Sequence, residues 1–408
     1  MTRAPDLWTL NMFSCGRWIA SSFITAAILI GLFAPIPASW QTLLAITPRP
    51  HPSGTATFPL QTVLDDPQQG YSAKRPFQPG ITKPAGENYT KMLVIPRTHA
   101  ENVDWIDENF GPDANIDWKI YVVDQPDAPL HPPQNKGHEV MVYLSYIIDH
   151  YDDLSDVNIF MHSHRHAWHN NDLLGSDAVQ VVSRLSSERV LREGYMNLRC
   201  HWDPGCPGWM NPGNIEEDVN KQEETMLAKS WSELFPLDAI PNVLAQPCCA
   251  QFAISRDRIR GLPLARYVAF REWLLKTNMS DYFSGRVFEY IWQFIFTGKN
   301  VVCSREHVCY CDGFGICFGG EKEYDVYNEK LKERTRMEEE LQELEDLRNN
   351  GQQDFALPEE RKYIELQENI ESLRAWCERE KDNARARGDV AEYRAREVGR
   401  SWKDGDGF

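Results

Sequence analysis

Hydrophobic residues follow three patterns along this chain of 408 residues. An uncharged apolar run covers residues 18–34, short β-branched runs alternate with helical spacing over residues 92–161, and apolar residues spaced by threes and fours return after residue 320. These patterns are typical of a membrane helix, a buried α/β sheet and paired amphipathic helices, respectively. We therefore expect a membrane-anchored α/β protein with a helical tail.

The globular part begins with three predicted strands, at residues 92–95, 118–123 and 157–161, because short branched runs suit buried strands. Between the second and third strands, apolar residues of segment 138–151 recur at helical spacing on one face. This β–helix–β order predicts an α/β fold with a mostly parallel sheet flanked by helices. Further helices are expected at 177–191, 263–275 and 285–296.

The C-terminal segment 321–408 is rich in charged residues, with apolar positions at heptad spacing. A loop signal at 349–358 divides it, so we expect a helical hairpin. The two helices would pair with each other in antiparallel fashion or form a coiled-coil contact with another chain, that is, by self-association.

The apolar run predicts a signal anchor at residues 18–36, since it follows Arg17 and ends at Pro35. Basic residues precede the run, so the positive-inside rule leaves residues 1–17 in the cytosol and the rest in the lumen, which is type II topology. The short span favours the endoplasmic reticulum or Golgi. The alternative is a signal peptide cleaved near Ala38, which would give a secreted protein.

The lumenal part is predicted to have two regions before the tail. Residues 37–88 are rich in Pro, Gly and Ser and indicate an extended stem, while 89–320 form the α/β domain. Asn88 and Asn278 begin Asn-x-Ser/Thr motifs, which accept glycans in a lumenal chain.

The net charge makes nucleic acid an improbable partner. The chain has 60 acidic and 43 basic residues and a formal charge of −17. A negative field of this kind repels phosphate backbones.

Eight cysteines lie between Cys200 and Cys317, an even number that indicates disulfides in an oxidising compartment. Cys200 and Cys206 flank a turn sequence and could pair with each other. The alternative is zinc bound by the cysteines of 303–317 together with His307, although paired C-x-x-C spacing is missing there. Cys377, in the tail, is left over for an intermolecular bridge.

Four histidines follow the third predicted strand within eight residues, in the segment 161–172 (MHSHRHAWHNND). Loops beyond the carboxyl ends of parallel strands often carry sites, and imidazole, guanidinium, amide and carboxyl groups can bind anions and hydroxyls or transfer protons. For each single histidine, the alternative is a solvated or turn-forming role. The candidate residues in this loop are His162, His164, Arg165, His169, Asn170 and Asp172.

Three further residues are candidates for the same site. Arg199 precedes Cys200, and Arg286 and Glu289 share one face of an apolar helix. A carboxyl group in such a helix is either paired, here with Arg286, or lies in a cleft where a raised pKa suits a general base. The sequence leaves both interpretations open.

Several blocks resemble an uncharacterised fungal family, known as domain of unknown function 3431. They include NKGHEVMVYLSYIIDHYDDL, IFMHSHRHAWHNND, CCAQFAISRDRI and SGRVFEYIWQFIF. The resemblance covers roughly residues 91–317 and implies membership of the family without implying an activity.

The order of the blocks is also similar to that of GT-A-type glycosyltransferases, which use nucleotide sugars and begin with β–α–β units behind a type II anchor. That likeness implies that Glu289 is the general base and that the loop 162–172 faces the sugar nucleotide. The sequence departs from the pattern at His162-Ser163-His164, where such enzymes carry a cation-binding Asp-x-Asp. No metal site is therefore predicted, and the cofactor is left open.

The sequence favours a membrane-anchored, glycosyltransferase-like enzyme that takes a nucleotide sugar and a glycan acceptor and acts on glycans or glycoconjugates. The alternative is a non-catalytic membrane-anchored module that binds glycan or protein. In the enzyme hypothesis the catalytic residues are His162, His164, Asp172 and Glu289, and the substrate-binding residues are Arg165, His169, Asn170, Arg199 and Arg286.

Overall fold

The computed structural model describes residues 77–408 except 112–114, 217, 220 and 350–356. The predicted cytosolic tail, the anchor at 18–36 and most of the stem lie outside the described residues. Within the described part, none of the helices has the length and apolar character needed to cross a membrane.

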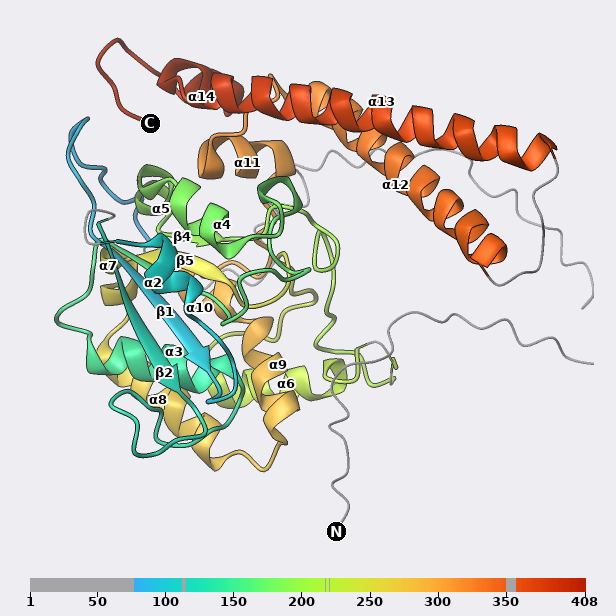
Figure 1. Ribbon diagram of the computed structural model, residues 1–408. Helices are drawn as coiled ribbons and strands as arrows, with labels where there is room; N and C mark the ends of the chain where they lie inside the picture. The colour runs from blue at the N-terminus through green and yellow to red at the C-terminus, as the bar shows by residue number, and fades with distance from the viewer. Residues whose placement is uncertain (1–76, 112–114, 217, 220, 350–356) are drawn as a thin grey trace, which may run out of the picture. The chain divides into compact units, whose positions relative to one another are not determined.

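A five-stranded sheet in the order β2-β1-β3-β5-β4 forms the centre of the domain (Figure 1). Strands β1, β2 and β3 pair in parallel, whereas β5 runs antiparallel to both β3 and β4. The predicted α/β sheet flanked by helices is confirmed, but the sheet is mixed, since two of its four pairings are antiparallel. The strands are β1 (Lys91–Arg97), β2 (Ile116–Val122), β3 (Val157–Phe160), β4 (Tyr195–Asn197) and β5 (Phe252–Ser255).

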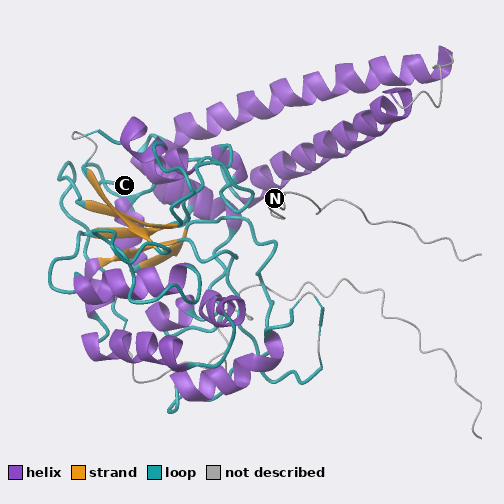
Figure 2. Ribbon diagram, turned by 60° about the horizontal axis from the view of Figure 1, so that its bottom comes forward, coloured by secondary structure: helices purple, strands orange, loops and turns teal. Residues whose placement is uncertain are grey.

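Helices cover both faces of the sheet (Figure 2). The helices are α2 (Trp105–Asn109), α3 (Glu139–Asp149), α4 (Ala178–Arg184), α5 (Ser187–Glu193), α6 (Glu224–Leu234), α7 (Arg256–Arg260), α8 (Leu264–Lys276), α9 (Asp281–Glu289), α10 (Trp292–Thr297), α11 (Glu306–Phe314), α12 (Glu321–Asn349), α13 (Leu357–Gly388) and α14 (Ala391–Glu397).

Side-chain alternation along the strands builds two cores. In β1, Val94 packs into the core that also contains residues of α3, α6, α8, α9 and α10. Its neighbours Leu93 and Ile95 pack into the other core, with residues of α2, α4, α5 and α11. In β3, Phe160 and Ile159 divide between the two cores in the same way. Because successive side chains of a strand point to opposite faces, a continuous apolar run fills both layers.

Two of the predicted helices are each divided into two. The segment 177–191 forms α4 and α5, because the side chain of Ser186 accepts a hydrogen bond from the Arg189 N–H and begins a new helix. The segment 285–296 contributes the end of α9 and then α10, with a break at Tyr290 and Ile291. Both breaks leave the apolar faces on the sheet.

The described end of the predicted stem lies on the domain. The ring of Phe77 contacts the guanidinium of Arg258, 4.7 Å from its centroid, and the Gly80 N–H donates to the Arg192 carbonyl. Lys83 pairs with Asp156 at 2.7 Å. Residues 77–88 are therefore part of the folded unit.

The tail forms the predicted helical hairpin, in which α12 and α13 lie side by side (Figure 1). Ion pairs such as Lys362–Glu340 and Arg374–Glu338 cross between the helices. The hairpin also joins the domain, since the Cys317 N–H donates to the Ala384 carbonyl. Cys377 is free but only 1% exposed, so its thiol is not at the surface, where an intermolecular bridge would need it.

Four disulfides form among the described residues, and none of them is the predicted local pair. Cys200 and Cys206 pair with Cys309 and Cys303, respectively, 109 and 97 residues further along the chain. The prediction that Cys200 and Cys206 bond to each other was therefore wrong, because the long connection through β5 returns α11 to the end of β4. The other two bridges are Cys248–Cys249 and Cys311–Cys317.

Candidate functional site

A pocket of about 310 Å³ opens at the carboxyl ends of the three parallel strands. Arg97 ends β1, Val123 follows β2, and His162 lies just beyond β3. In open α/β sheets this edge is where ligands bind. The titratable residues of the lining are Arg97, Glu101, His138, Glu139, His162, His164 and Asp281.

The histidine loop is held to the sheet through its first residue. The His162 N–H donates to Gln251 Oε1 at 3.1 Å, and Gln251 immediately precedes β5. His162 Nδ1 and His169 Nε2 lie 3.0 Å apart and share a hydrogen bond. His162 Nε2 is buried and has no partner among the described residues.

Both paired imidazoles are neutral at physiological pH. Burial, aided by repulsion from His169, lowers the pKa of His162 to about 3. Burial and the nearby Arg199 lower the pKa of His169 to about 4. Two protonated rings would both be donors and could not share this hydrogen bond, so at least one ring stays neutral. A neutral imidazole has one donor and one acceptor nitrogen, which suits the pair to hydrogen bonding with neutral groups such as hydroxyls.

His164 lies at the exposed side of the pocket, with its Nε2 3.5 Å from Glu101 Oε1. Burial opposes ionisation of Glu101, but hydrogen bonds from Thr98 and Ser163 outweigh it and lower the pKa of Glu101. Glu101 therefore supplies a fixed negative charge beside His164.

Glu139 was not among the candidate residues from the sequence, yet its carboxyl group lines this pocket and has a raised pKa. It is the first residue of α3, and burial raises its pKa to about 8. The charge of Glu289 raises this pKa further, while Arg286 opposes the rise. A signal existed in the sequence: an acidic residue begins the helix that follows β2 and so lies at the same sheet edge.

A glycine brings α9 against the beginning of α3. A Cβ on Gly285 would lie 2.9 Å from the His138 ring and 3.1 Å from the Gly137 carbonyl, so a larger residue would push the helices apart. At the start of α9, Asp281 Oδ1 accepts a hydrogen bond from the Gly137 N–H at 2.5 Å. This contact places Asp281 in the pocket lining.

The predicted pair Arg286–Glu289 forms, at 2.7 Å, within a larger charge network. Arg286 also contacts Glu223 at 2.8 Å, and the Tyr290 hydroxyl donates to Glu223. Glu289 Oε1 accepts from the Cys249 N–H at 2.9 Å, and burial raises the pKa of Glu289. Within the described residues, none of these hydrogen bonds or ion pairs reaches the histidine loop.

The remaining predicted loop residues shape the loop. Arg165 pairs with Asp177, whose carboxylate also caps α4. Asn170 is 2% exposed, and its amide group is bonded to the Arg165 and Ser176 carbonyls and to Gln251.

Asp172 and Arg199 lie outside the pocket lining. Asp172 pairs with His201 at 3.3 Å. The guanidinium of Arg199 donates to the Trp168 and Asp203 carbonyls. The structure thus brings His162 and His164 together in the pocket, with His169 behind them. Arg286 and Glu289 pair with each other, and neither they nor the remaining candidates line this pocket.

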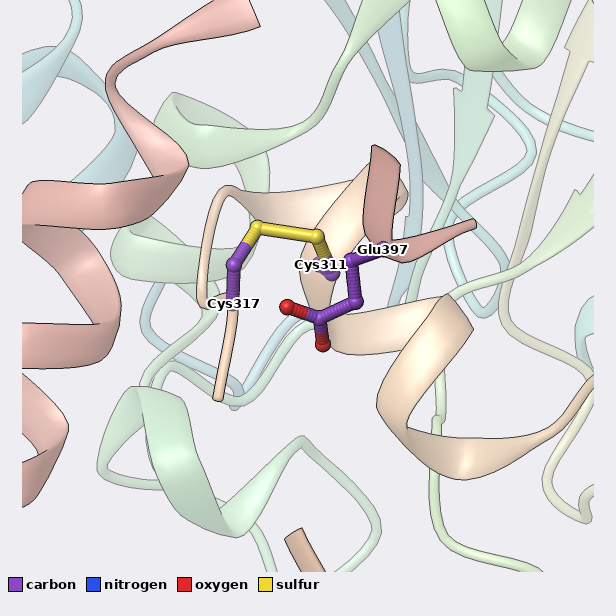
Figure 3. Close-up of side chains that lie close together, drawn as sticks. All are labelled: Cys311, Cys317 and Glu397. Atoms are coloured by element: carbon purple, nitrogen blue, oxygen red, sulfur yellow. A yellow bond between two sulfur atoms is a disulfide. The ribbon is translucent and has the colours of Figure 1, made fainter. Parts of the chain in front are cut away.

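Zinc is a poor fit to the cysteine-rich segment. Among the described residues, the one group close enough to hold a metal ion consists of Cys311, Cys317 and Glu397. Figure 3 shows that the two sulfur atoms of this group are bonded to each other. Cys303 and Cys309 are likewise in disulfides, so none of these four sulfurs is a thiolate ligand.

Comparison with known proteins gives one match. The family described as "Protein of unknown function (DUF3431)" matches residues 93–312, just over half of the chain. No curated protein and no solved structure matches. The matched segment begins within β1, ends within α11 and contains every residue that lines the pocket at the sheet edge. The chain therefore belongs to this family of proteins of unknown function.

Proposed function

We propose that this protein is a glycosyltransferase-like enzyme that acts on glycans or glycoconjugates. The observation that carries the proposal is the pocket at the sheet edge, where the neutral imidazole of His162 converges with His164 and with the carboxyl group of Glu139. Imidazole and carboxyl groups hydrogen-bond to hydroxyls, which are the main polar groups of sugars. A carboxyl group whose pKa lies near the working pH suits a general base.

In this proposal Glu139 takes the role that the sequence suggested for Glu289. The carboxylate of Glu289 is occupied by Arg286 and the Cys249 N–H, whereas Glu139 lines the pocket. Glu139 would accept the proton of an acceptor hydroxyl, and His162 and His164 would orient the sugar. Glu289 acts on this step through its charge, which raises the pKa of Glu139.

The proposal includes a type II anchor at residues 18–36, with the domain in the lumen of the endoplasmic reticulum or Golgi. Four disulfides support it, because such bonds persist in oxidising compartments. Protease added to sealed microsomes should leave the domain intact, and its digestion would refute this topology.

A second candidate is a non-catalytic module that binds glycan or protein. Trp168 favours it, because this indole on the histidine loop is 67% exposed and offers an aromatic surface. Turnover separates the two candidates, since the binding module would bind a ligand without releasing nucleotide.

The deciding experiment exposes the full chain to a panel of nucleotide sugars, with and without Mn²⁺, and measures thermal shift and nucleotide release. The enzyme proposal predicts turnover with at least one donor and a loss of about 10²- to 10⁴-fold in Glu139→Gln, the contribution of a general base. Glu108→Gln, at an exposed position on α2, is the matched control and should retain full activity. No turnover across the panel would refute the enzyme proposal.

A further inference from the structure

A second pocket, of about 260 Å³, lies beside the edge strand β4, and its lining is strongly basic. Five basic residues line it, whereas Glu193 is the one acidic residue among its described lining residues. The chain as a whole carries a net charge of −17, so this cluster runs against the overall composition. The basic residues are Arg189, Arg192, Arg199, Arg258 and Lys299.

Two of these arginines are buried without a carboxylate partner among the described residues. Arg258 is 8% exposed, and its guanidinium donates to the carbonyls of Phe296, Glu193 and Gln78. Arg199 is 6% exposed and likewise donates to two carbonyls, while its Nε is buried without a partner. Burying a positive charge against neutral groups is costly, and a bound anion would offset that cost.

The two arginines from α5 share the carboxylate of Asp312, and Arg192 also donates to an oxygen of Phe408 at 2.8 Å. Arg189 lies 3.1 Å and Arg192 lies 2.8 Å from the carboxylate of Asp312, which Arg400 also contacts at 3.4 Å. Three guanidiniums on one carboxylate leave a local excess of positive charge. Arg189 is 6% exposed, and its Nε is also buried without a partner.

The backbone makes room for one of the buried guanidiniums. Gly194 has a φ of +76°, and a Cβ at this position would lie 2.4 Å from Arg258 Nε. A side chain at residue 194 would therefore displace Arg258 from the pocket wall.

We propose that this pocket binds a phosphate group, either free or carried by a larger ligand. Guanidinium groups bind phosphate with paired hydrogen bonds, and buried ones do so with little competition from water. A volume of about 260 Å³ lies below the usual range for whole drug-sized ligands, which fits a compact anion. The pocket shares no lining residue with the histidine pocket, so the inference stands apart from the proposed function.

The test measures binding of inorganic phosphate, pyrophosphate and uridine diphosphate to the full chain by titration calorimetry at constant ionic strength. We expect saturable binding of at least one of these anions. Lys299→Gln should weaken it by about two- to fivefold, the effect of one solvent-screened charge, because Lys299 is exposed. Val302→Glu, which adds a carboxylate to the lining, should abolish it.

The matched control is Lys229→Gln, since Lys229 is an exposed lysine that lines a different groove. It should leave the affinity unchanged, and thermal unfolding of each variant verifies that the fold is intact. Tighter binding of uridine diphosphate than of pyrophosphate would identify a nucleotide as the phosphate source, and equal or weaker binding would identify the free anion. Absence of saturable binding, or equal effects of the two lysine variants, would overturn the proposal while leaving the test at Glu139 unaffected.

Discussion

Replacing Arg286 by Met should destabilise the protein strongly at neutral pH. The guanidinium lies 2.7 Å from Glu289 and 2.8 Å from Glu223, and these carboxylates are 8% and 1% exposed as whole residues. Methionine preserves much of the side-chain volume but removes the charge, which leaves two buried carboxylates facing each other. Breaking a buried ion pair costs about 3–5 kcal/mol. We expect about 3 kcal/mol, because the Arg286 side chain is itself 29% exposed.

The loss should depend on pH in a defined direction. Without Arg286, burial holds the folded-state pKa of Glu289 above the unfolded value of about 4.3. Carboxyl groups whose pKa is raised by folding contribute full stability below the unfolded pKa, and this contribution is lost as pH rises through the folded pKa. The variant should therefore be closer to wild type at pH 5 than at pH 7.5.

Urea unfolding at both pH values, with disulfides intact, measures this effect as a shift of the midpoint. Adding Glu289→Gln to Arg286→Met should restore part of the stability, because it removes one of the unpaired charges. Arg336→Met, on the exposed side of α12, is the control and should change stability by less than about 0.5 kcal/mol. A loss below about 1 kcal/mol in Arg286→Met, or an equal loss at both pH values, would refute the reasoning.

Three further predictions use independent measurements. Glu139 holds its proton up to about pH 8 in the folded state, so wild type should lose stability relative to Glu139→Gln as pH rises from about 4.5 to 8, and the difference should level off above 8; parallel melting curves would contradict this. Replacing Cys200 and Cys309 by Ala should cost about 3 kcal/mol, because the intact Cys206–Cys303 bridge already closes most of the loop; replacing the adjacent Cys248–Cys249 pair, which closes almost no loop, should cost far less, and calorimetric melting compares them. In cells, glycosidase treatment should increase gel mobility, and Asn278→Gln should remove part of that shift.

The two cores could be predicted from the sequence because burial there depends on local pattern. The apolar face of α3, with Val140, Tyr143 and Leu144, and the branched run of β1 are fixed by periodicity alone. The tail hairpin followed for the same reason. Strand β4 was not predicted because three residues carry no pattern, and β5 was not predicted because its sequence, FAIS, has a single β-branched residue, whereas the equally short β3 has two.

The candidate site was predicted only in part, because its assembly depends on which loops meet. The histidine loop could be placed at the sheet edge from its position after β3. Sequence spacing could not show that Arg165 would pair with Asp177, or that the side chain of Asn170 would be hydrogen-bonded to backbone carbonyls. Polar residues in a tight loop serve either the loop or a ligand, and only tertiary contacts distinguish the two uses.

The antiparallel direction of β5 explains why the edge of the sheet at the end of β3 gathers polar groups beyond those that follow the parallel strands. Because β5 is antiparallel to β3, the segment before it arrives at the same edge where β3 ends. Gln251 can then hold His162, and the Cys249 N–H can hold Glu289, whose charge acts on Glu139. A single antiparallel strand thus couples the histidine loop, the carboxyl group that titrates near pH 8 and the arginine network, although these lie far apart in the sequence.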